Sequence, residues 1–83
     1  MHKILVEIFN PASGNTYDVF IPLKSQVYEV VFLLSTTISE LSLGHYKATE
    51  QTVLCDRITG NVFDINGTIE ELGLKNGSKL MLL

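Results

Sequence analysis

Only one stretch of this chain carries a helical repeat. Apolar residues recur there at intervals of three and four, in a stripe made of Val27, Val30, Val31, Leu34, Ile38 and Leu41. This spacing is typical of one face of an amphipathic helix. Ser25 is expected to cap the start of this helix, and Gly44 lies beyond its end. A single helix can cover only one face of one sheet, so the sequence predicts a two-layer α+β domain.

Short strand-like segments separated by turn residues surround this helix. The expected strands are residues 3–9, 16–21, 51–56, 62–65 and 78–83. The Asn- and Gly-containing loop between the first two predicts a hairpin. Residues 68–72 are expected to form one helical turn before the last strand. The chain is short enough for a single domain over residues 1–83, with a mixed sheet of five strands, or of four strands and one short strand.

Composition excludes several classes of function. The net charge is −3 and the six basic residues are scattered, which argues against nucleic-acid binding. Charged residues make up only 18% of the chain, against about 25% in an average domain, so some apolar side chains are expected at the surface. A single cysteine forbids an internal disulfide, and no apolar run is long enough to insert into a membrane. A cytoplasmic protein is therefore expected.

The order of these elements resembles the ubiquitin-like β-grasp fold. The similarity covers nearly the whole chain and includes the stretch from Thr68 to Leu80 before the final strand. Within that superfamily the chain is most similar to the YukD/EsaB family of bacterial type VII secretion accessory proteins. The residues that carry this similarity are the hairpin with Asn10 and Asn15, the helix from Val27, and the Asn76-Gly77 turn.

The resemblance implies a non-catalytic protein-interaction module. Its expected partners are other subunits of the secretion machine, such as the membrane-bound ATPase. The sequence ends at Leu83, the last residue of the final expected strand, without a Gly-Gly tail. This ending disfavours the alternative of a ubiquitin-like modifier or sulfur carrier. A regulatory β-grasp domain of a larger transporter is a further alternative.

The resemblance also implies which residues of each strand face the helix. The inward set would be Ile4, Val6, Ile8, Tyr17, Val19, Ile21, Val53, Cys55, Leu80 and Leu82. The open face would then carry an apolar patch made of Leu5, Phe9, Phe20, Leu54, Met81 and Leu83. We expect this patch to bind a protein partner, with Leu54 near its centre. Formation of a homodimer through the same face is the alternative.

A secondary patch is expected on the helix. Tyr28 and Phe32 are four residues apart and so are neighbours on a flank away from the apolar stripe, while Leu33 falls on the opposite flank. These two aromatic side chains either bind a partner or pack beneath the loop at residues 42–46.

No catalytic, cofactor or metal site is expected. Cys55 lies in a predicted strand without a nearby cation or base, which favours a core residue over a reactive thiol. His2 and His45 are far apart and have no cysteine or carboxylate at ligand spacing.

Overall fold

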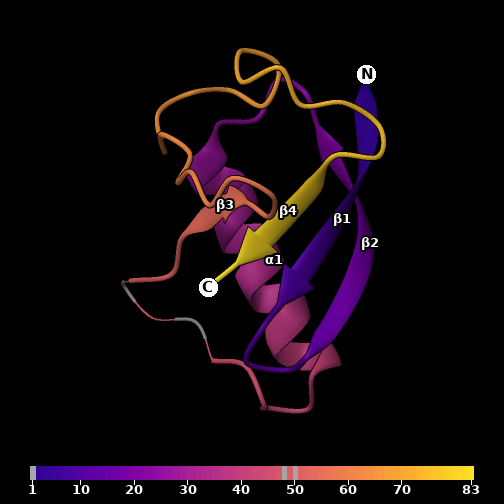
Figure 1. Cartoon of the computed structure of the whole chain (residues 1–83), viewed down its shortest axis with the longest axis vertical. Coiled ribbons are helices and arrows are strands. Elements are labelled where there is room, and N and C mark those ends of the chain that lie inside the picture. The colour runs from indigo at the N-terminus through magenta and orange to yellow at the C-terminus, as the bar shows by residue number, and fades with distance from the viewer. Residues whose placement is uncertain (1, 48, 50) are drawn as a thin grey trace.

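The described part of the chain folds into a four-stranded sheet covered on one face by a single helix. The structure is a computed structural model, and it describes residues 2–47, 49 and 51–83. Its elements, in chain order, are β1 (Lys3–Asn10), β2 (Asn15–Pro22), α1 (Val27–Leu41), β3 (Leu54–Asp56) and β4 (Lys79–Leu82). Figure 1 shows α1 lying behind the sheet and crossing it obliquely. The predicted α+β architecture is confirmed.

The sheet is mixed, with the strand order β2-β1-β4-β3. β1 and β2 form the predicted antiparallel hairpin, and β3 pairs antiparallel with β4. β1 and β4 pair in parallel at the centre, where Ile8 lies beside Leu80. The two central strands therefore come from opposite ends of the chain. No helix in the described part of the chain has the length and apolar character needed to cross a membrane.

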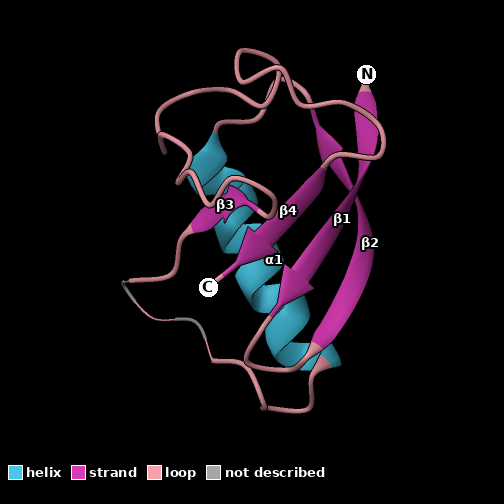
Figure 2. Cartoon of the chain, viewed as in Figure 1, coloured by secondary structure: helices cyan, strands magenta, loops and turns pink. Residues whose placement is uncertain are grey.

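The second half of the chain contains less strand than predicted. β3 has three residues, and the strand expected at residues 62–65 is absent, since Val62 forms only an isolated bridge with Cys55. Figure 2 shows this segment as loop. Asp64 ends the pairing because its side chain accepts the backbone N–H of Asn66 at 2.9 Å and its carbonyl accepts that of Gly67 at 3.2 Å. These bonds form a turn in place of a ladder.

Ser25 was predicted to cap the start of α1, but a segment distant in the sequence holds it instead. The N-cap is Gln26, whose backbone N–H donates to the Glu29 carboxylate at 3.1 Å. The first helical amides, of Val27 and Tyr28, donate to the carbonyls of Gly67 and Ile65 at 2.9 and 3.1 Å. These amides have no partner inside the helix, so the loop at residues 65–67 satisfies them instead.

The core lies between α1 and the sheet, and the register predicted for the hairpin is confirmed. The buried residues that form the core are Ile4, Val6, Ile8, Ile21, Val27, Val30, Leu34, Ile38, Tyr46, Leu54, Ile69, Leu80 and Leu82. Tyr17 and Val19 are partly buried against them. The core thus combines four residues of the helix stripe with the inward residues of every strand, while Val31 is only partly buried and Leu41, at the end of the predicted stripe, is exposed.

The predicted faces of Leu54 and Cys55 were wrong. Leu54 pairs with Leu82, which faces α1, and is only 1% exposed within the core. Cys55 pairs with Met81 on the other side of the strand, although it is also 1% exposed. Val53 was also predicted to face the helix, but it lies on the same side as Cys55. It pairs with Leu83 through two backbone hydrogen bonds, at 3.3 and 3.0 Å. A shift of one residue reverses every side chain of a strand, and this segment is apolar at successive positions.

Leu54→Ala should therefore destabilise the fold and not simply change a surface. We expect a loss of about 2–5 kcal/mol in the free energy of unfolding, because the truncation leaves a cavity between β3 and α1. Urea denaturation followed by circular dichroism measures the loss. Leu41→Ala is the matched control, since Leu41 is 60% exposed at the end of α1. Equal stabilities for the two variants would contradict the assignment of Leu54 to the core.

Candidate functional site

The outer face of the sheet is built from rows of side chains that cross the strands. In the first row, Phe20 of β2 lies beside Leu5 of β1. Both side chains are exposed, and Phe20 retains 62% of its accessible surface. The Asn76-Gly77 turn borders the row and bonds to Leu5, whose N–H donates to the Asn76 side chain and whose carbonyl accepts the Gly77 N–H, both at 2.8 Å. The first row is therefore an apolar pair on a rigid backbone.

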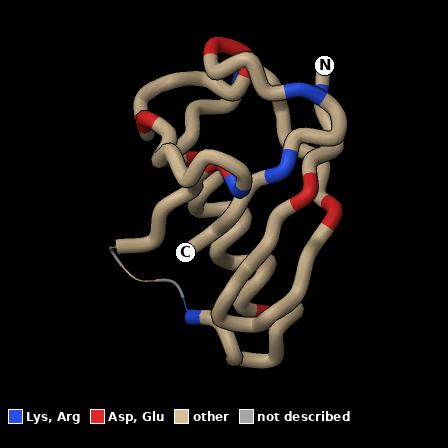
Figure 3. Tube along the Cα trace, in the orientation of Figure 1, with Lys and Arg blue, Asp and Glu red and all other residues tan. Residues whose placement is uncertain are grey.

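The second row is charged. It runs from Asp18 through Glu7 to Lys79, which are neighbours in register on β2, β1 and β4. Arg57, just beyond β3, joins it and pairs with Glu7, with 3.6 Å between Arg57 Nη1 and Glu7 Oε1. Figure 3 shows that Lys, Arg, Asp and Glu gather in the upper half of the molecule, while the strands below them are largely uncharged.

The third row is apolar again and partly covered. It contains Phe9, Met81 and Cys55, in register across β1, β4 and β3. The guanidinium of Arg57 lies over the Phe9 ring, 4.6 Å from its centroid, in a cation–π arrangement. Leu83, which follows β4, is half exposed. This row is less open than the Phe20–Leu5 pair.

The predicted six-residue apolar patch is therefore not continuous. Leu54 lies in the core, and the charged row separates Leu5 and Phe20 from Phe9, Met81 and Leu83. The sequence interpretation missed the charged row because it counted only apolar residues as candidates. The signal was present, since Glu7 and Asp18 alternate with Leu5 and Phe20 along their strands.

The helix patch is exposed and not covered by the loop at residues 42–46. Tyr28 is half exposed and Phe32 is 64% exposed. Within that loop, Tyr46 turns into the core, and its N–H donates to the Ser42 hydroxyl at 3.0 Å. Leu33, predicted on the opposite flank, lines the far side of the same shallow groove as Tyr28 and Phe32. The aromatic pair and Leu33 thus form one surface.

The thiol of Cys55 is held in its neutral form. Burial raises its pKa above the ordinary value of 9.0, and the neighbouring Asp56 carboxylate adds to this effect. The Cys55 Sγ lies 3.5 Å from the Met81 carbonyl, to which it donates. A nucleophilic cysteine needs the opposite shift, toward the thiolate. His2 and His45 are both exposed, and the described residues contain no cluster of side chains able to hold a metal ion.

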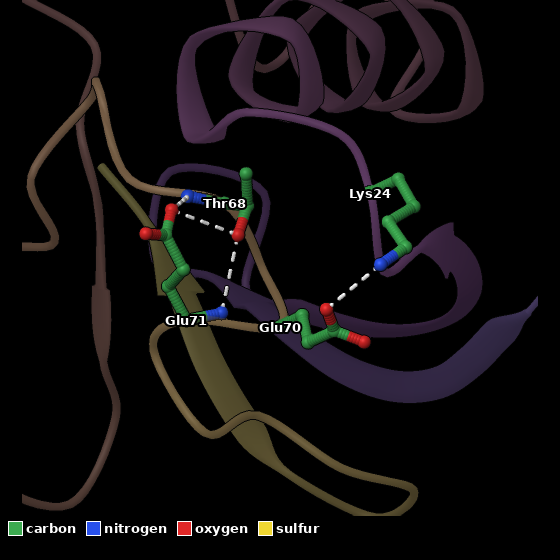
Figure 4. A network of polar contacts seen from close by, with 4 residues as sticks. All are labelled: Lys24, Thr68, Glu70 and Glu71. Carbon is green, nitrogen blue, oxygen red and sulfur yellow. Dashed lines mark hydrogen bonds and ion pairs between the residues drawn. The ribbon is translucent and has the colours of Figure 1, made fainter.

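Glu70 and Glu71, in the turn at residues 68–72, are engaged in structural contacts. Figure 4 shows the Glu71 carboxylate accepting the N–H and the hydroxyl of Thr68, both at 3.0 Å, while Thr68 Oγ1 accepts the Glu71 N–H at 3.1 Å. These bonds lower the pKa of Glu71, chiefly through the Thr68 amide. Glu70 pairs with Lys24 at 2.9 Å. The contacts form the predicted turn at residues 68–72 and join it to the segment before α1.

Cys55 should react slowly with alkylating reagents. We expect iodoacetamide to modify the native protein at least about 100-fold more slowly than the urea-unfolded chain at pH 8, because the thiol is buried and protonated. Intact mass spectrometry gives both rates. Rapid labelling of the native protein would contradict a buried thiol.

Folding raises the pKa of Cys55, so its contribution to stability should be lost as the pH rises above about 9.0. Cys55→Ala should remove that loss of stability.

Comparisons with known proteins identify the fold. No protein-family model and no curated protein sequence matches the chain. Among solved structures, the chain is similar to the ubiquitin-like domain of the Mycobacterium tuberculosis type VII secretion protein EccD1, with 16% identity, 100% and 99% of the two chains covered, and a TM-score of 0.78. It is also similar to the EccD5 ubiquitin-like domain of Mycobacterium xenopi, with 17% identity, 100% and 94% coverage, and a TM-score of 0.76.

A component of a toluene 4-monooxygenase complex matches comparably, with 13% identity, 98% and 96% coverage, and a TM-score of 0.74. At such identities the similarity concerns the fold and not the activity. The chain has the ubiquitin-like β-grasp fold.

Proposed function

We propose that this chain is a non-catalytic docking module that binds other proteins through the outer face of its sheet. The observation that carries this proposal is the exposed Phe20–Leu5 pair on two paired strands. An aromatic side chain held on a rigid strand binds a partner at low cost in conformational entropy. Large aromatic residues are also frequent among those that dominate binding energy.

The charged row beside this pair supports the same use. Asp18, Glu7, Lys79 and Arg57 present both signs of charge next to an apolar contact. A partner with complementary charges would be held in one orientation, since charge pairs around an interface contribute more to specificity than to affinity. The shifted pKa values have structural causes, because backbone N–H groups lower those of Glu71 and Asp56 and burial raises that of Cys55.

We further propose that the module is an accessory component of a bacterial type VII secretion system in the cytoplasm. The structural similarity to the ubiquitin-like domains of EccD1 and EccD5 supports this assignment, together with the resemblance of the sequence to the YukD/EsaB family. The partner would be the membrane-bound secretion ATPase or another subunit of that machine.

Phe20→Thr should weaken partner binding without unfolding the protein. Threonine is favoured in strands, so β2 is retained while the aromatic contact is lost. We expect the dissociation constant for the purified cytosolic part of the secretion ATPase to rise about tenfold or more. Isothermal titration calorimetry measures it, and circular dichroism verifies the fold. Leu41→Ser on α1 is the matched control, because Leu41 is exposed to nearly the same extent as Phe20 and lies outside the apolar groove of α1.

The outcomes separate the two parts of this proposal. Unchanged binding by a folded Phe20→Thr protein would rule out the sheet face as the docking surface. If the unmodified chain binds neither the ATPase nor any other subunit of the machine, the secretion assignment is wrong.

A further inference from the structure

The outward face of α1 is unusually apolar for a surface helix. Only two of its 15 residues are charged, Glu29 and Glu40. The core face is made of Val27, Val30, Leu34 and Ile38, yet Tyr28, Phe32 and Leu33 are exposed on the other side. A helix that is apolar on both sides is typical of one that is covered on both sides. The sheet covers only one of them (Figure 1).

The outward face is shaped to receive a helix. Its groove is lined by two adjacent ridges, Tyr28–Phe32–Thr36 and Glu29–Leu33–Thr37, each with a spacing of four residues. Such ridges bound the grooves into which the side chains of a packing helix insert. The first half of this groove has large side chains and the second half has small ones. A helix that packs here must have its bulk in the opposite order.

We propose that this helix is α1 of a second copy of the chain, packed antiparallel about a two-fold axis between Phe32 and Leu33. In that arrangement Tyr28 lies opposite Thr37 of the second copy, Glu29 opposite Thr36, and Phe32 opposite Leu33. At each end of the interface the large Tyr28 side chain meets the smaller Thr37. At the axis the apolar side chains of Phe32 and Leu33 meet. The six lining residues are therefore complementary to themselves, as a two-fold interface requires.

The charges select the same arrangement. The antiparallel packing separates the two Glu29 carboxylates by seven residues, or about 10 Å along the axis. A parallel packing would place Glu29 directly opposite its equivalent, with no cation among the helix residues to compensate. The acidic residues also disfavour an anionic lipid surface as the occupant of this face.

The dimer would make the docking module bivalent. Because α1 covers one face of the sheet, joining two copies through α1 leaves both outer sheet faces directed away from each other. A partner with two or more equivalent sites would then be held by two contacts, which raises the apparent affinity without a new kind of contact. The self-association itself does not depend on the proposed function, because it uses the opposite layer of the domain.

The dimer should be visible by sedimentation. A groove lined by six residues is smaller than a standard interface of about 800 Å² per partner, so we expect a weak dimer. The weight-average mass should rise from 9.2 kDa toward twice that value between about 10 µM and about 1 mM. Phe32→Ser should remain monomeric over this range, since Ser and Phe have similar helix propensities. Phe20→Thr, the control on the sheet face, should dimerise like the unmodified chain.

Each other result overturns the proposal. A chain that is monomeric at every concentration has no such dimer, and a dimer that survives in Phe32→Ser but not in Phe20→Thr uses the sheet face. Loss of the dimer in both variants, each folded by circular dichroism, would show that α1 alone does not form the interface.

The register has its own test at Thr36, which lies opposite Glu29 of the second copy in the antiparallel packing. Thr36→Lys should dimerise about fivefold more tightly than Thr36→Glu, because the two substitutions place opposite charges near that carboxylate. Adding Glu29→Gln to both should remove most of this difference. Equal dissociation constants for the two single variants would overturn the antiparallel register.

Discussion

The parallel pairing of β1 with β4 is the contact on which the rest of the fold depends. It joins strands from the two ends of the chain, so the intervening segments must cross from one edge of the sheet to the other. Asn10 holds this pairing at the end of β1. Its buried side chain donates to the Leu82 carbonyl at 3.0 Å and accepts the Ser13 N–H at 2.9 Å, which fixes the hairpin loop and β4 together. A buried amide without these partners would destabilise the core, so the contact specifies one arrangement.

The second half of the chain stabilises the helix as well as completing the sheet. The carbonyls of Ile65 and Gly67 accept the first amides of α1, and the Ile69 N–H donates to the Ser25 carbonyl at 3.0 Å. Thr68 and Glu71 bond to each other in both directions and so hold this segment in its turn (Figure 4). Ile65, the last residue of the predicted fourth strand, is therefore used together with Gly67 to cap a helix, because the backbone groups at the helix start need partners that the helix does not supply.

These contacts give the domain two separate surfaces on opposite layers. On the sheet side, two apolar rows are divided by the charges of Glu7, Lys79 and their neighbours. On the helix side, the exposed residues around Phe32 are almost free of charge. A mixed surface suits a selective and reversible partner, whereas a uniform apolar groove suits a complementary helix. The low charge content of the whole chain is thus matched by apolar side chains that remain exposed on the helix as well as on the sheet.

The sequence by itself determined the elements with strong periodicity and the faces that follow from them. The hairpin of β1 and β2, the helix from Val27 and the exposure of Phe20 were all predicted, because long alternating or helical patterns distinguish inside from outside. Only the tertiary structure decided the face of Leu54, the loss of the strand at residues 62–65, and the position of Lys79 and Arg57 beside the outward charges of Glu7 and Asp18. These features depend on the register between β3 and β4 and on hydrogen bonds between residues far apart in the chain. A three-residue strand with apolar side chains at successive positions carries no periodicity from which its register can be determined.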